Sequence, residues 1–328
     1  MCACTEEMRF TEFPRVKVGL VHLDRKRPWP SSVNPETGRE WALDMKEKML
    51  QILTNTNHSV YRSDLEVKVD DDPSLRSALA LCSGEGCSVI LCIQPTISDG
   101  RLAPLLAQQW GPGLVLWASP EEQTGEMISG NSLVGTHLMS ATLRQLGRQV
   151  ELVYHNLDWE AAERSLRRAI NVGFACRNIR KTKVALIGHQ APGFLDFHPN
   201  PFVMSKTFGA ILQHVGLAEY VTTALEAVTE EEVKRDVEKV LNDLNFPFKA
   251  ASTGFGIEES DLPISSRHYL AMKKIVNENN FDALAIRCWP EVNHNYHFKT
   301  KINLIICSAT RACRAGSVAV HGPGQARH

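Results

Sequence analysis

The chain lacks the sequence signatures of several common protein classes. It contains no Gly-x-Gly-x-x-Gly after a strand and no Walker loop, so neither a dinucleotide nor a nucleoside triphosphate is indicated. Gly-x-Ser-x-Gly and His-Glu-x-x-His are absent too, which argues against the common hydrolases and metalloproteases. An excess of one charge is also missing, because 36 Lys and Arg balance 37 Asp and Glu. No global field favours nucleic acid or an anionic membrane, and we expect neither as a partner.

Long hydrophobic runs are absent as well. The longest ones, such as Val89–Ile93 and Leu114–Ala118, have the length of a strand and are far too short to cross a bilayer. The first ten residues contain no apolar stretch that could form the core of a signal peptide. From these absences we expect a cytoplasmic protein.

The nine cysteines are then expected to be reduced thiols. Cys82, Cys87 and Cys92 lie five residues apart, and Cys307 and Cys313 lie six apart. Neither spacing matches the close Cys pairs of a zinc site. We interpret these residues as small buried apolar side chains.

Short β-branched runs alternate with helical periodicity along most of the chain, which predicts parallel βα units with right-handed crossovers. The expected strands are 15–22, 65–69, 88–93, 113–118, 150–154, 183–188 and 283–287. The expected helices are 35–53, 74–82, 102–110, 132–147, 158–170, 203–215, 229–244 and 265–277. Asn131 or Ser132 is the expected cap of the fourth helix, and Thr229 with Glu232 forms a capping box.

The pattern predicts an α/β protein with two consecutive Rossmann-like, doubly wound parallel-sheet domains, the second of them incomplete. Residues 1–14 are expected to be a disordered N-terminus. The first domain is expected at 15–177 and the second at 178–291, with the boundary near Asn178 in the basic connector Arg177–Lys183. Residues 292–328 form an atypical tail that is expected to be disordered.

The tail contains no Asp or Glu, although acidic residues are frequent before it. Its one apolar run, Ile302–Ile306, is long enough to add a strand. The remainder has neither helical nor strand periodicity, and we interpret it as a substituted end rather than the completion of a domain.

Ligands of open parallel sheets bind beyond the carboxyl ends of the strands. The loops to search are therefore Asp24–Pro30, Gln94–Asp99, His189–Asp196 and Arg287–Glu291. Gly188–Phe197 has glycine and proline at both ends, which suits either a ligand loop or a tight βα turn. Arg287, Trp289 and Glu291 suit a polyhydroxylated ligand, through stacking and paired hydrogen bonds, or equally an exposed salt bridge beside a packed Trp.

Four segments in this order resemble the L-fucose isomerase and L-arabinose isomerase superfamily, especially its fucose isomerase-like members. They are Val16–Pro30, Ser129–Leu138, Val184–Phe197 and Asp282–Glu291, and the likeness covers most of residues 15–291. The resemblance implies carbohydrate metabolism, two Rossmann-like domains before a β-barrel-containing domain, and interconversion of aldoses and ketoses. It also implies a divalent ion, usually Mn²⁺, held by two acidic residues and a histidine.

The departures from that family are as informative as the likeness. The family's metal carboxylates lie beyond Glu291, where this chain has no acidic residue, and His294 with His297 would make only a weak pair. We therefore expect no catalytic residue and no metal ligand in this chain, a C-terminally truncated form of the family, and no isomerase activity of the chain alone.

What the resemblance carries over is contact with a monosaccharide. The implied substrate-binding residues are Arg25, Arg27, Gln94, Arg287 and Trp289. A non-catalytic sugar-binding module and a regulatory subunit are the alternatives. In either case we expect a homo-oligomer, or association with a full-length homologue.

Overall fold

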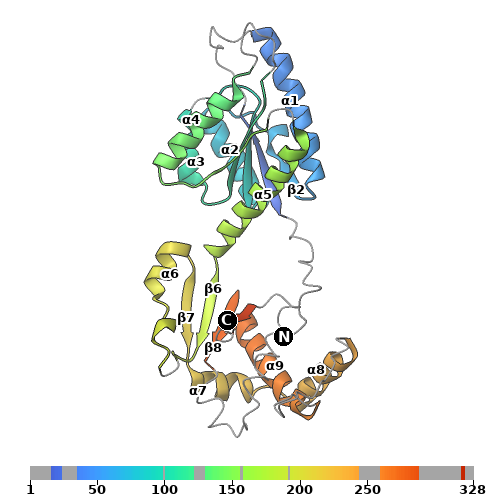
Figure 1. Ribbon diagram of the computed structural model, residues 1–328, viewed down its shortest axis with the longest axis vertical. Helices are drawn as coiled ribbons and strands as arrows, with labels where there is room; N and C mark the ends of the chain where they lie inside the picture. Colours follow the sequence, from blue (N-terminus) through green and yellow to red (C-terminus); the bar gives the residue numbers. More distant parts are fainter. Residues whose placement is uncertain are drawn as a thin grey trace, which may run out of the picture. The chain divides into compact units, whose positions relative to one another are not determined.

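The computed structural model describes residues 16–23, 35–98, 100–121, 130–155, 158–190, 193–243, 259–287 and 319–321. It divides into two compact units, Met1–Asn178 and Ile179–His328 (Figure 1). Each unit contains a parallel sheet with helices packed against it. The α/β class that the sequence predicts is confirmed.

The sheet of the first unit has the order β2-β1-β3-β4-β5, and every pairing in it is parallel. Every residue of the central strand β3 and of its neighbour β4 is buried. This is the pattern of a strand that is covered on both faces, and it explains the continuous apolar runs in the sequence. The strands are β1 (Lys17–His22), β2 (Ser59–Arg62), β3 (Val89–Gln94), β4 (Leu114–Ala118) and β5 (Glu151–Val153).

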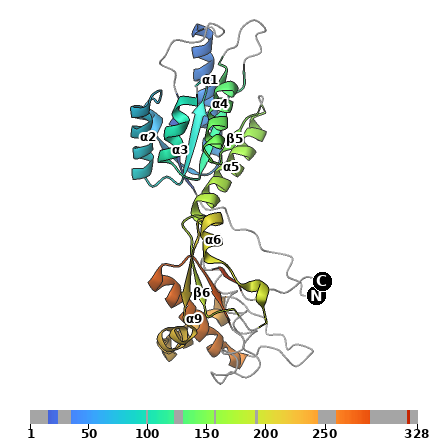
Figure 2. The ribbon, with the colours of Figure 1, turned by 90° about the vertical axis from the view of Figure 1, so that its left-hand side faces the viewer.

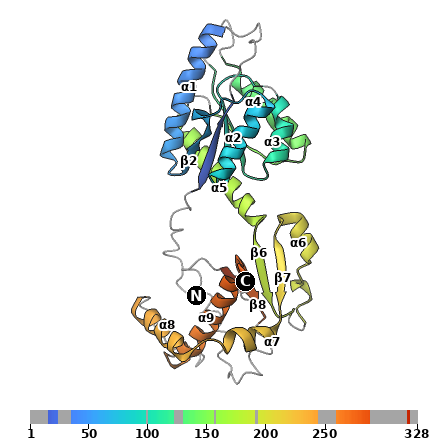
Figure 3. The same ribbon diagram turned by 180° about the vertical axis from the view of Figure 1, so that it is seen from behind.

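Five helices cover this sheet, with α1 and α5 on one face and α2, α3 and α4 on the other (Figures 2 and 3). The face under α1 and α5 contains the fully buried Leu20, Leu91 and Trp117. Each such side chain stabilises the fold by about 1.5–3 kcal/mol relative to an exposed one. The helices are α1 (Pro35–Asn55), α2 (Asp72–Gly84), α3 (Ala103–Gln109), α4 (Ser132–Gln145) and α5 (Trp159–Ile179).

The predicted strand at 65–69 is wrong. The second strand is instead β2, and a turn of 3₁₀-helix, η1 (Ser63–Leu65), follows it. Of the predicted run, Val69 makes only an isolated parallel bridge to Leu23. Leu65 is exposed, so its apolar character does not report a core position.

The second unit has a sheet of order β7-β6-β8-β9, again parallel throughout. Its strands are β6 (Lys183–Ile187), β7 (Ile211–Val215), β8 (Ala283–Ile286) and β9 (Ala319–His321). Three residues of the segment expected to be disordered therefore form a strand that pairs with β8. The run Ile302–Ile306 lies outside the described residues.

One face of this second sheet packs against the π-helical turn η4 (Tyr220–Leu225), α8 (Glu230–Asp243) and α9 (Leu262–Asn279). The opposite face, which contains Val184 and Leu186, is only half buried. The short helix α6 (Pro201–Phe208) has no buried residue, and its Phe202 side chain is 81% exposed. The remaining short elements are η2 (Gly100–Leu102), η3 (Leu195–Phe197), α7 (Leu217–Glu219) and η5 (Glu259–Asp261).

The predicted helix at 203–215 is two elements, α6 and β7. The side chain of Asn200 accepts from the backbone N–H groups of Phe202 and Val203, so the helix begins at Pro201. Gly209, with φ of 76°, ends it in the left-handed conformation. The capping box of α8 is confirmed, because Thr229 and Glu232 exchange hydrogen bonds.

A buried polar pair lies in the core of the second unit. His268 of α9 is 1% exposed, and its Nδ1 lies 2.7 Å from the hydroxyl of Tyr220, which is fully buried. Burial, with a smaller effect of the Arg267 charge, lowers the pKa of His268 to about 4. The imidazole is therefore neutral in the folded protein at neutral pH.

This pKa makes the second unit sensitive to acid. Between pH 6.5 and pH 4 the unfolded chain binds a proton at residue 268 that the folded chain does not bind. The free energy of unfolding should fall as the pH falls through this window, by up to about 3 kcal/mol. Urea unfolding at a series of pH values measures this dependence. His268→Asn should flatten it, whereas His198→Asn, at an exposed position, should leave it unchanged. An unchanged slope in His268→Asn would contradict the account.

Candidate functional site

The carboxyl ends of the strands in the first unit bring several polar groups together. In the order β2-β1-β3-β4-β5 the chain reverses its direction of winding between β1 and β3, which is where open sheets of this kind bind ligands. Gln94 is the last residue of β3, and Ser119 directly follows β4. These residues form the edge that we call the first rim, together with Glu121 and Ser132.

Among the described residues, the predicted substrate-binding residue on the first rim is Gln94, and the structure buries it completely. Its Nε2 donates a long hydrogen bond to the sulfur of Met139, at 3.6 Å. Its Oε1 is buried and has no hydrogen-bond partner among the residues that the structure describes. A buried amide oxygen without a donor costs about 1–3 kcal/mol, and a ligand hydroxyl or a water molecule would remove that cost.

The hydroxyl of Ser132 joins the ends of β3 and β4. It donates to the backbone carbonyl of Gln94 and accepts from the backbone N–H of Ser119 at 2.9 Å. The Ser119 hydroxyl donates in turn to the carbonyl of Pro95 at 3.3 Å. All of these serine groups are buried, so the hydrogen bonds fix the backbone that carries Gln94.

The N-terminus of α4 is capped by a carboxylate from another segment. Glu121, in the loop after β4, accepts from the backbone N–H of Gly130 at 2.9 Å and from that of Ser132 at 3.1 Å. The sequence predicts a cap by Asn131 or Ser132, but the Asn131 side chain makes no capping hydrogen bond. A negative charge at a helix N-terminus is favourable, so this carboxylate occupies the place that an external anion would take.

α4 also approaches the loop after β3 very closely. A Cβ atom added at Gly135 would lie 2.4 Å from the carbonyl oxygen of Ser98 and 3.1 Å from Oε1 of Gln94. Only glycine allows this helix to pack directly on the backbone of the rim.

Gly135→Ala should therefore disturb the first rim. Because the obstacle is backbone, we expect the free energy of unfolding of the first unit to fall by about 1–3 kcal/mol. Urea unfolding followed by intrinsic tryptophan fluorescence measures it, since Trp117 lies in the core of this unit. The matched control is Gly84→Ala at the end of α2, where nothing lies within 4 Å of an added Cβ. Equal effects of the two substitutions would contradict the close approach.

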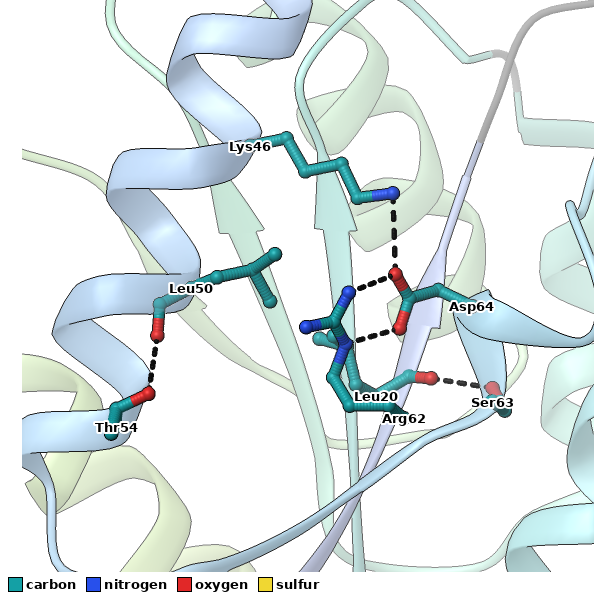
Figure 4. Close-up of polar contacts among 7 residues, drawn as sticks. All are labelled: Leu20, Lys46, Leu50, Thr54, Arg62, Ser63 and Asp64. Carbon is teal, nitrogen blue, oxygen red and sulfur yellow. Dashed lines mark hydrogen bonds and ion pairs between the residues drawn. The ribbon is translucent and has the colours of Figure 1, made fainter.

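A charged cluster lies at the carboxyl end of β2 (Figure 4). Arg62 holds Asp64 with two hydrogen bonds of 2.6 and 2.7 Å, and Lys46 of α1 lies 3.2 Å from the same carboxylate. The Asp64 side chain is fully buried. Burial opposes its ionisation, but the hydrogen bonds and charges of Arg62 and Lys46 hold its pKa below the usual value. The two cations exceed the one carboxylate, so this corner of the sheet is positive.

The carboxyl ends of β6 and β8 form a second rim in the second unit. Arg287 follows β8, and its Nη1 donates to the carbonyl of Gln190 at 3.2 Å. Gly188, with φ of 76°, lies directly against the Arg287 side chain, since a Cβ added there would be 3.2 Å from that of Arg287. The ring of His189 stacks on that of His214 with their centres 5.2 Å apart. The first residues of the two unusual loops, Gly188–Gln190 and Arg287, thus meet at one edge.

Of the five predicted substrate-binding residues, Gln94 lies on the first rim and Arg287 on the second. Arg25, Arg27 and Trp289 lie outside the described residues. The sequence pattern did not point to Ser119 or Glu121, and it pointed to Ser132 only as a possible helix cap. Ser119 and Glu121 follow a buried strand, and Ser132 lies in the quoted segment 129–138, which was the available signal.

The described residues do not fit a resident metal ion. Among them, no group of three His, Cys, Asp or Glu side chains could hold one. Asp64 and Glu121 are both engaged, the first with cations and the second with backbone N–H groups. We therefore assign no ligand to a metal in this part of the chain.

In the same described ranges, no helix has the length and apolarity of a membrane span.

Comparison with known proteins finds sugar isomerases. No family profile matches the chain. It is 24% identical over 222 residues to the sulfoquinovose isomerase of Priestia aryabhattai, covering 66% of this chain and 47% of that protein. The protein of the same name from Alkalicoccus urumqiensis is 24% identical over 198 residues, covering 60% of this chain and 42% of its own length. The one from Clostridium sp. (strain MSTE9) is 24% identical over 228 residues, or 68% and 47%.

The chain thus spans about half the length of the curated relatives it matches. These similarities support a relationship to sugar isomerases. They do not single out the fucose and arabinose isomerase superfamily.

Proposed function

We propose that this chain supplies the substrate-binding α/β units of a sugar aldose–ketose isomerase of carbohydrate metabolism. The observation that carries the proposal is the match to several sulfoquinovose isomerases over about two thirds of the chain. The two rims agree with it, because polar groups gather there at the carboxyl ends of the strands, where parallel sheets bind ligands.

The chemistry of the rims suits a polyhydroxylated ligand. A monosaccharide offers many hydroxyl groups that both donate and accept, so its site needs fixed donors and acceptors. On the first rim, Oε1 of Gln94 is a buried acceptor whose amide is held between Met139 and Gly135. On the second, the Arg287 guanidinium brings five N–H donors in a rigid plane. Hydrogen bonds to that charge are stronger than neutral ones.

Sugar isomerisation also requires groups that polarise oxygen and move a proton between adjacent carbons. The described residues contain no cluster for a divalent ion, and no Asp or Glu follows Glu291. We propose that the chain by itself binds a monosaccharide but does not isomerise it. This proposal holds whether the chain is related to the fucose isomerase-like proteins or to another branch of sugar isomerases. Mn²⁺ is the ion of the fucose isomerase-like family, and we propose that this chain does not hold it.

A non-catalytic sugar-binding module, or a regulatory subunit, would use the same rims. This alternative agrees with the described residues, which supply hydrogen-bonding groups for a sugar but no cluster that could hold a metal ion. The expected homo-oligomer, or complex with a full-length homologue, stays a prediction that mass measurement in solution tests.

Calorimetric titration of the full chain tests binding. L-fucose, D-arabinose, L-arabinose and the anionic sugar sulfoquinovose form the panel. We expect at least one to bind, and Arg287→Met to weaken it by about tenfold or more, since a charge-assisted hydrogen bond contributes about 1.5–3 kcal/mol. Arg148→Met, at an exposed position just beyond the end of α4, is the matched control and should bind as the wild type does.

The same preparations with Mn²⁺ are then assayed for ketose formation. Binding without turnover supports the proposal. Turnover at enzyme-like rates would refute the inactivity of the chain, and the absence of any binding would refute the assignment of the rims.

A further inference from the structure

The C-terminus of α2 has a backbone geometry that pairs two cysteines. The helix ends at Gly84, and Gly86 follows in the left-handed conformation with φ of 72°. The backbone N–H of Cys87 donates to the carbonyl of Cys82 at 2.9 Å, and that of Gly86 donates to the carbonyl of Ser83 at 3.0 Å. These two hydrogen bonds define a Schellman motif.

A Schellman motif brings two particular side chains into contact, those of the third helical residue from the end and of the second residue beyond the cap. Here both are cysteines, Cys82 and Cys87. The first is fully buried and the second 3% exposed, and both belong to the core between α2 and the sheet. Gly19 of β1 leaves the room for this packing, since a Cβ there would lie 2.6 Å from the sulfur of Cys82.

The backbone hydrogen bond also limits how far apart the two residues can be. With nitrogen and oxygen 2.9 Å apart, peptide bond lengths hold the two Cα atoms within about 6.8 Å of each other. That is inside the range a disulfide can bridge, about 4.4–6.8 Å. The separation of the two backbones is therefore compatible with a disulfide.

The two thiols also interact with each other. A hydrogen bond from the thiol of Cys87 holds the pKa of Cys82 below the usual thiol value, although burial opposes this. The same interaction and burial raise the pKa of Cys87. A thiolate is the nucleophile in disulfide exchange, so Cys82 is the more readily activated of the two.

We propose that Cys82 and Cys87 are a reversible dithiol–disulfide site that closes the C-terminus of α2. With glutathione disulfide as oxidant, the thiolate of Cys82 attacks one glutathione sulfur. This forms a mixed disulfide and releases one glutathione thiolate. The thiol of Cys87 then loses its proton to solvent, attacks the Cys82 sulfur and releases the second glutathione thiolate. Two protein thiols are oxidised by two electrons, and the glutathione disulfide is reduced to two thiols.

Two other cysteines provide built-in comparisons. Cys92 lies in β3, and complete burial raises its pKa to about 12. Cys176 of α5 is exposed but follows no such turn. Oxidation should therefore join Cys82 to Cys87, leave Cys92 reduced and convert Cys176 at most to a mixed disulfide.

The exposed residues Ser83–Gly86 give the oxidant access when the last turn of α2 opens. An equilibrium measurement avoids any dependence on how fast that opening is. The full chain is incubated to constancy in glutathione redox buffers, quenched with N-ethylmaleimide under denaturing conditions and digested with trypsin and a glutamate-specific protease.

The digestion is informative because the tryptic peptide Ser77–Arg101 contains Cys82, Cys87 and Cys92 together, and cleavage after Glu85 separates the first from the other two. A disulfide leaves the two fragments joined, and fragmentation between residues 87 and 92 identifies the partner. We expect the 82–87 link to exceed the mixed disulfide at Cys176 by about tenfold or more, because the second thiol is already in place.

Cys87→Ala should abolish the linked fragment, whereas Cys176→Ser should leave it unchanged. The wild-type mass measurement stands by itself if Cys87→Ala fails to fold. The proposal would be overturned if N-ethylmaleimide labelled both Cys82 and Cys87 after incubation in oxidising buffer, or if the link joined Cys82 to Cys92.

The site is independent of sugar binding, since the turn lies next to the amino end of β3, where the backbone N–H of Ser88 donates to the carbonyl of Lys17.

Discussion

The hydroxyl of Ser132 holds the first rim together. One oxygen atom donates to the carbonyl of Gln94 and accepts from the N–H of Ser119, so it ties the ends of β3 and β4 to the first turn of α4. The arrangement requires the helix to come close, which the missing side chain of Gly135 allows. It also requires a partner for the N–H of Ser132, and Glu121 supplies it. These contacts fix the backbone of Gln94, whose buried Oε1 has no hydrogen-bond partner in the described part of the chain.

The second unit also fixes a polar side chain at the end of a strand, with other residues. Gly188 ends β6 in a conformation that side chains disfavour, and the space beside it is taken by Arg287 from the neighbouring strand. The carbonyl of Gln190 accepts from that guanidinium and orients it. Each unit thus places a hydrogen-bonding side chain at the carboxyl edge of its sheet through a glycine that permits close packing. Sugar isomerases are the relatives that this chain matches, and polar edges of this kind suit their substrates.

The sequence predicts the architecture well because the buried parallel strands are continuous apolar runs, as in β3 and β4. The prediction is wrong where residues that end a helix are overlooked. Asn200, Pro201 and Gly209 together mark an eight-residue helix, so a helix through residue 215 was wrong. The rim was predictable only in part. Gln94 ends a strand and Arg287 follows one, and both are visible in the sequence. The capping of α4 by Glu121 joins residues nine and eleven positions apart through a loop, which no local pattern encodes.

Hydrogen exchange of the full chain, with and without a monosaccharide at saturation, shows whether the strand ends of the two sheets bind a sugar. Backbone amides open locally with different free energies, and a ligand protects those it covers or orders. We expect slower exchange at residues 94, 96–98, 119, 121 and 130–132 on the first rim and at 188–190 on the second. The turn at 83–87, on the amino side of the first sheet, should be unchanged. Protection at that turn with both rims unaffected would contradict the assignment of the strand ends as the sugar site.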